Sequence, residues 1–194
     1  MRSLLFIFVF IGSLFSASVE DYVKELEKMP EEKFKKLLQA YVYGIMHDWE
    51  YTLPAVAWKE SNFDTKAVSK VGALGTYQVM PRYHAKVSGE KVEHVKQKLI
   101  KDQVYASTAS ANNLNYWKWY HGDEAYTKIL ASYNAGFNVK AGMEYAKDVK
   151  LRAKAIKKYL TSRGIHIHMR KAYEDAVASQ STHLRYSRNI LALR

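Results

Sequence analysis

Apolar residues recur at helical spacing along most of the chain, and this periodicity limits the fold to a mainly helical one. The predicted helices cover 19–29, 31–48, 54–61, 90–120 (as one helix or two), 123–134, 140–162, 174–178 and 182–193. The pattern breaks between Asn62 and Met80, where Gly72 and Gly75 stand among small and polar residues. We expect a loop there, with a short β-hairpin. With only 3 prolines and 13% aromatic residues in 194, the chain is expected to fold as a globule.

The first 18 residues have the layout of an export signal. Arg2 gives a positive start, residues 4–15 are almost entirely apolar, and Ser16-Ala17-Ser18 offers the small residues that a signal peptidase requires. Cleavage is expected after Ser18, and a retained N-terminal anchor is the alternative. The chain has no cysteine, which excludes disulfides, lipidation and a thiolate nucleophile. These features predict a protein exported to the bacterial periplasm, or beyond it, with no stable membrane insertion after cleavage.

The mature chain reads as one domain, since no repeat, linker or low-complexity segment divides it. We expect a helical segment over 19–42 to pack on a main domain over 43–194. A formal charge of +11 fits an acidic partner such as nucleic acid, an anionic membrane or a cell-wall polymer. The basic run 150–158 is typical of a solvated helix face, and no nucleic-acid-binding motif accompanies it, so nucleic acid is not expected. His166 and His168 have no neighbouring Asp, Glu or Cys to complete a metal site, and no metal is predicted.

One carboxylate stands where an apolar helix face should continue. Leu53, Val56 and Ala57 follow helical spacing, and Glu60 takes the next position of that series. From these residues alone, a surface glutamate at the end of a helix is the commoner interpretation, because glutamate is rarely buried. The alternative is an acid on a poorly solvated face. Burial and the negative end of the helix dipole would both raise the pKa of such an acid.

Several motifs follow Glu60 in a fixed order. They are Glu60-Ser-Asn-Phe63, then Gly72-Ala-Leu-Gly75-Thr-Tyr-Gln-Val-Met-Pro81, then Ala131-Ser-Tyr-Asn-Ala-Gly136, and a late tyrosine in His183–Ile190. Over about residues 43–194 the chain resembles the lytic transglycosylase (SLT) family, relatives of goose-type lysozyme. The resemblance implies a lysozyme-like α+β fold that is mainly α. Thr76-Tyr77 departs from the usual apolar Leu-Met pair, which affects the expected wall of the cleft.

The resemblance also implies a reaction. Family members cleave the β-1,4 bond between N-acetylmuramic acid and N-acetylglucosamine in peptidoglycan without adding water, and leave a 1,6-anhydro-muramyl end. Glu60 would act first as the acid and then as the base, an exception to the two-carboxylate rule of glycosidases. The implied substrate-binding residues are Ser61, Gln78, Met80, Tyr133, Asn134 and Tyr186. Tyr173 competes with Tyr186 as the late tyrosine.

No cofactor is implied, and the expected partners are peptidoglycan glycan strands, with secretion-system or other cell-envelope proteins as further candidates. We expect a monomer. Two alternatives stay open at this point. One is a goose-lysozyme-like hydrolase that attacks the glycan with water. The other is a non-catalytic peptidoglycan-binding component of a secretion apparatus.

Overall fold

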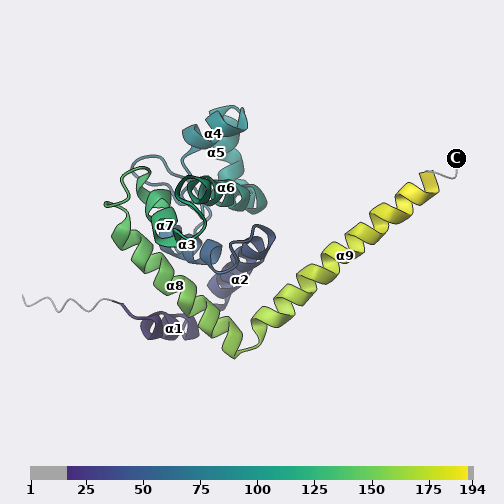
Figure 1. The fold of residues 1–194 in the computed structure, drawn as a ribbon, viewed down its shortest axis with the longest axis horizontal. Coiled ribbons are helices and arrows are strands. Elements are labelled where there is room, and N and C mark those ends of the chain that lie inside the picture. The colour runs from purple at the N-terminus through teal and green to yellow at the C-terminus, as the bar shows by residue number, and fades with distance from the viewer. Residues whose placement is uncertain (1–16, 192–194) are drawn as a thin grey trace, which may run out of the picture.

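The computed structural model describes residues 17–191, and residues 180–191 by their backbone only. Helices make up most of this region, which confirms the mainly helical prediction (Figure 1). In order they are α1 (Val19–Glu27), α2 (Glu31–Met46), α3 (Thr52–Ser61), α4 (Pro81–Ser88), α5 (Val92–Lys101), α6 (Gln103–His121), α7 (Tyr126–Ala135), α8 (Met143–Ser162) and α9 (Ile165–Leu191).

Helix α3 occupies the middle of the domain. Every residue from Thr52 to Trp58 is buried, so this helix has no polar face over its first two turns. A helix that is apolar all round is stable only when other elements surround it, and α2, α6 and α8 pack against α3. The helix ends where Asn62 adopts the left-handed conformation. Glu60 therefore emerges from the core at the last turn of a buried helix.

Helix α8 packs against helices from distant parts of the chain. It packs against α7, α3 and α1, so the N-terminal helix lies against α8 although more than a hundred residues separate them. The turn between α7 and α8 comes very close to α7 at Gly142. A Cβ atom at this position would lie 2.1 Å from the carbonyl oxygen of Ala131. Glycine at this position is what allows α8 to start so close to α7.

The loop after α3 contains less β-structure than a hairpin. Its β-structure consists of two isolated antiparallel bridges, Val68 with Leu74 and Leu74 with Val79. Gly72 and Gly75 both have positive φ angles, which confirms that the loop uses their conformational freedom. At Gly75 a Cβ atom would also lie 2.5 Å from the carbonyl oxygen of Leu99, so the loop is packed closely against α5.

Two parts of the helical structure differ from the sequence prediction, and a third decides an alternative that the sequence left open. Helix α4 was not predicted, and it begins with Pro81 in its first turn. The segment 90–120 forms two helices, because Asp102 is extended and its side chain caps α6 by accepting a hydrogen bond from the backbone N–H of Tyr105 (3.0 Å). The C-terminal segment is one helix, α9, which leaves the body of the domain after Gly164 (Figure 1).

Candidate active site

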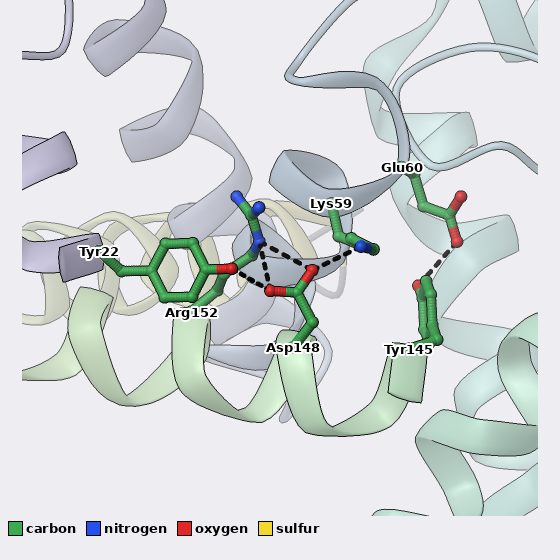
Figure 2. Close-up of polar contacts among 6 residues, drawn as sticks. All are labelled: Tyr22, Lys59, Glu60, Tyr145, Asp148 and Arg152. Carbon is green, nitrogen blue, oxygen red and sulfur yellow. Dashed lines mark hydrogen bonds and ion pairs between the residues drawn. The ribbon is translucent and has the colours of Figure 1, made fainter. Parts of the chain in front are cut away.

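Glu60 is the last residue but one of α3 and is partly buried. The hydroxyl group of Tyr145, on α8, donates a hydrogen bond of 2.7 Å to its Oε1 (Figure 2). The hydrogen bond from Tyr145 is the one that the Glu60 carboxyl group receives from the described residues, so Oε2 has no partner among them. One oxygen is thus held by the protein, and the other is available to exchange a proton with a bound molecule.

The surroundings of Glu60 raise its pKa. Burial disfavours the anion and raises the pKa of Glu60 to about 7, against the hydrogen bond from Tyr145 and the charge of Lys59, which both lower it. The carboxyl group is therefore close to half protonated at neutral pH. A group with such a pKa can donate a proton in one step and accept one in the next.

Two tyrosines stand beside this carboxyl group. The rings of Tyr133, on α7, and Tyr145 are nearly parallel, with centroids 6.5 Å apart and 9° between their planes. Burial, followed by the negative charge of Glu60, raises the pKa of both hydroxyl groups, so both stay protonated. The Tyr133 hydroxyl donates to the backbone carbonyl of Tyr77 (2.8 Å) and lies 2.9 Å from the Ser110 hydroxyl. Tyr133 therefore connects α7 to α6 and to the loop after α3.

Ser61 and Gln78 both bond to the backbone of that loop. The Ser61 hydroxyl donates to the carbonyl oxygen of Thr76 (2.8 Å). Gln78 has a positive φ angle, and its side-chain amide donates to the carbonyl oxygens of Gly75 (3.0 Å) and Ala67 (3.2 Å). The structure thus gives these two predicted site residues partners within the protein, in the segment that follows the catalytic candidate.

The other predicted residues are less constrained. Met80 is half-buried and precedes α4, whereas Asn134 is exposed near the end of α7. The side chain of Tyr186 lies outside the described residues, although its backbone belongs to α9. Tyr173, half-buried on the same helix, has no hydrogen bond to Glu60; in the described region that bond comes from Tyr145.

A second polar cluster, centred on Asp148, lies next to the Glu60–Tyr145 pair on α8. The Lys59 ammonium group lies 2.6 Å from Oδ2 of Asp148 (Figure 2). The other oxygen of this carboxylate, Oδ1, accepts a hydrogen bond from the Tyr22 hydroxyl, and Nε of Arg152 lies 3.4 Å from Oδ2. Burial acts against the charged form of Asp148. Hydrogen bonds from Lys59 and Tyr22, with the positive charge of Arg152, nevertheless hold its pKa below the ordinary value.

Comparison with known proteins gives this arrangement a family. A model described as the transglycosylase SLT domain matches residues 36–156, which is more than half of the chain. The chain belongs to this family. It is also 32% identical, over 132 residues, to an uncharacterized 20.7 kDa protein of the vs-regB intergenic region of Enterobacteria phage T4. That match covers 64% of this chain and 70% of the phage protein, and no solved structure matches.

Membership of the SLT family assigns this chain a function of the lytic-transglycosylase type, with peptidoglycan as substrate and therefore an action outside the cytoplasm. Glu60, Tyr133 and Tyr145 all lie within the segment that matches the SLT model, and helix α1 lies before it. Among the residues with described side chains, no three His, Cys, Asp or Glu gather into a group that could hold a metal ion. No helix of the described region is long and apolar enough to cross a membrane.

Sequence reasoning missed Tyr145. On α8 it lies on the buried face that continues through Val149, Ala153 and Ile156, at helical spacing. Like Glu60, it is a polar group on an otherwise apolar stripe. This polar position on an apolar stripe was the one feature of the sequence that could have pointed to Tyr145. It could not reveal which helix faces α3, because only the packing of α8 against α3 brings the two polar groups together.

Proposed function

We propose that this SLT-family protein is a peptidoglycan lytic transglycosylase in which Glu60 is the single acid and base. It would cleave the β-1,4 bond between N-acetylmuramic acid and N-acetylglucosamine and leave a 1,6-anhydro-muramyl end. The observation that carries this proposal is one partly buried carboxyl group with a pKa of about 7 and one unpartnered oxygen. The groups that shift this pKa are Tyr145 and Lys59, and neither is a second carboxylate.

The reaction would proceed in two steps. In the first, Glu60 gives its proton to the glycosidic oxygen, the bond from that oxygen to C1 of the muramyl sugar breaks, and N-acetylglucosamine leaves with the proton. In the second, the Glu60 carboxylate takes the proton of the sugar's own C6 hydroxyl, whose oxygen bonds to C1 and closes the ring. The muramyl N-acetyl group would stabilise the positive charge that develops at C1 between the steps.

The remaining site residues would divide into two groups. Asn134, which is exposed, and Met80, which is half-buried, would contact the glycan. Ser61, Gln78 and Tyr133 would form the surface beside the acid through their bonds to loop carbonyls. In this proposal the tyrosine that holds the acid is Tyr145 on α8, whereas the resemblance implied a late tyrosine in the site, Tyr186 or its competitor Tyr173.

We further propose export to the bacterial periplasm, removal of the N-terminal signal and action as a monomer on glycan strands, alone or with other cell-envelope proteins. The N-terminal cap of α1 includes Ser18, the residue after which the signal is expected to be cut. Ser18 caps this helix, accepting from the Asp21 backbone N–H (3.2 Å) while the Asp21 carboxylate accepts from the Ser18 backbone N–H (3.0 Å). A cut before Ser18 preserves this cap, and a cut after it removes the cap.

The proposal is tested by mass spectrometry of the muropeptides released from purified sacculi. We expect the wild-type protein to release fragments with 1,6-anhydro-muramyl ends and the Glu60→Gln variant to lose about 10²- to 10⁴-fold in rate, as expected for loss of a general acid. Glu93→Gln, the same change at an exposed position on α5, should retain full activity. Reducing ends would instead support a hydrolase, and binding without release would support a non-catalytic module.

A further inference from the structure

The end of α3 places two consecutive side chains on two sites of α8. Lys59 reaches Asp148 (2.6 Å), and Glu60 receives the hydrogen bond of Tyr145 (2.7 Å). Tyr145 and Asp148 are three residues apart, so they lie one helical turn from each other on the same face. Figure 2 shows these contacts side by side, Lys59 with Asp148 and Glu60 with Tyr145. The Lys59 cation and the neighbouring acid are thus each bound by a different residue of α8.

Asp148 is itself held from two directions. The Tyr22 hydroxyl of α1 donates to its Oδ1, and Nε of Arg152 lies 3.4 Å from both carboxylate oxygens. The Arg152 guanidinium is fixed in turn, because it lies over the rings of Tyr22 (4.4 Å) and Trp58 (4.5 Å). Only 18% of the Asp148 side chain is exposed. A carboxylate with this many partners keeps its position, and so does the Lys59 ammonium group bound to it.

The position of the Lys59 charge matters because of its neighbour. A nearby cation favours an ionised carboxylate and so opposes the effect of burial on Glu60. Pairing with Asp148 offsets part of the ammonium charge, which still lowers the Glu60 pKa, and an unpaired ammonium group would be free to turn toward Glu60. The charged and titratable groups that interact with Glu60 are Lys59 on its own helix, Tyr133 on α7 and Tyr145 on α8. Behind them stands Asp148 on α8, which binds Lys59. Asp148 is therefore the group that can control the cation.

We propose that Asp148, held by Tyr22 of α1, is a positioning residue that keeps the Lys59 ammonium group away from Glu60 and so keeps the acid protonated for its first step. The inference rests on the proposed role of Glu60. It gives α1, which precedes the segment matching the SLT model, a part in the site. Asp148 itself touches no reacting atom and acts through Lys59.

The test is a titration of the Glu60 carboxyl group by NMR with isotope-labelled glutamate, in the whole protein, with Glu60→Gln to assign the resonance. We expect Asp148→Asn to lower the Glu60 pKa by about 0.5 to 1 unit, at or below the low end of the effect of a close opposite charge. Lys59→Met should raise it, and Lys59→Arg, which keeps the charge, should leave it near the wild-type value. In a Lys59→Met background, Asp148→Asn should no longer lower the pKa.

An equal shift in both backgrounds would overturn the proposal, because Asp148 would then act on Glu60 directly and not through Lys59. An unchanged pKa in Asp148→Asn would overturn it as well. If the Asp148 variant does not fold, the Lys59 variants still test the proposal, because a Glu60 pKa that does not rise in Lys59→Met would show that the Lys59 charge does not act on Glu60. The titration needs no activity, so absence of cleavage by the wild-type protein would refute the proposed function alone. Where cleavage is present, the alkaline limb of its pH profile should move with the titration.

Discussion

At the scale of single residues, the raised pKa of Glu60 affects stability as well as chemistry. The unfolded carboxyl group has a pKa near 4.5, and burial raises the folded value to about 7. The folded state therefore binds the proton more tightly than the unfolded state. The contribution of this group is fully present below pH 4.5 and is lost as the pH rises through 7, where burial of the anion opposes folding.

This relation predicts that Glu60→Gln is more stable than the wild-type protein at alkaline pH. Glutamine resembles the protonated acid and can still accept the Tyr145 hydrogen bond. From about 1.4 kcal/mol per pKa unit, the gain in unfolding free energy should be about 3 kcal/mol at pH 8 and close to zero at pH 4. Urea unfolding at several pH values measures it, with Glu93→Gln as the control. A gain independent of pH would show that Glu60 is not a buried acid.

The residue scale also separates what the sequence could predict from what it could not. Glu60 interrupts an apolar series, a pattern visible within one helix, but it became the catalytic candidate only through the motifs that resemble the SLT family. The bonds of Ser61 and Gln78 to loop carbonyls depend on the course of the loop and on the positive φ of Gln78, which side-chain patterns do not report. The partner of Glu60 lies 85 residues away, and no local spacing singles it out.

At the scale of elements, the contact of α7 with α8 depends on one glycine. Gly142 has a negative φ of −87°, so alanine is conformationally acceptable there and would ordinarily be neutral or stabilising. The steric contact with Ala131 reverses this expectation. We predict that Gly142→Ala lowers the unfolding free energy by about 2–3 kcal/mol, which is typical of an overpacked site.

The matched variant is Gly89→Ala at the end of α4. This glycine has a positive φ of 73° and open space around its Cβ position, so alanine should cost about 1 kcal/mol through the backbone alone. Urea midpoints of the two variants measure the difference. A Gly142→Ala protein as stable as the wild type would show that α7 and α8 are not in such close contact.

Helical periodicity predicted most elements correctly, and the misses have physical causes. Helix α4 is short, and its apolar residues, such as Tyr83 and Val87, are exposed, so it has no long apolar stripe. The sequence left open whether 90–120 forms one helix or two, because the break between α5 and α6 rests on a single capping residue, Asp102, inside a continuous helical pattern. Helix α9 continues where the pattern weakens, with exposed residues over much of the stretch from Ile165 to Ser179.

At the scale of the whole molecule, the site is assembled from distant parts of the chain. Helix α3 carries the acid, α7 and α8 supply the two tyrosines, and α1 fixes the carboxylate that binds Lys59. The elements could be predicted one by one, but their arrangement arises from packing around the buried α3. The net charge of +11 favours association with an acidic wall polymer and has no part in this arrangement.

The central claim is that one carboxyl group cleaves the glycan strand without water. Its most direct test is digestion of purified sacculi in water labelled with heavy oxygen, followed by mass spectrometry of the released muropeptides. We predict muramyl ends that are lighter than reducing ends by one water molecule and contain no label. Reducing ends that carry one labelled oxygen would contradict the account, because water would then have attacked C1 of the muramyl sugar.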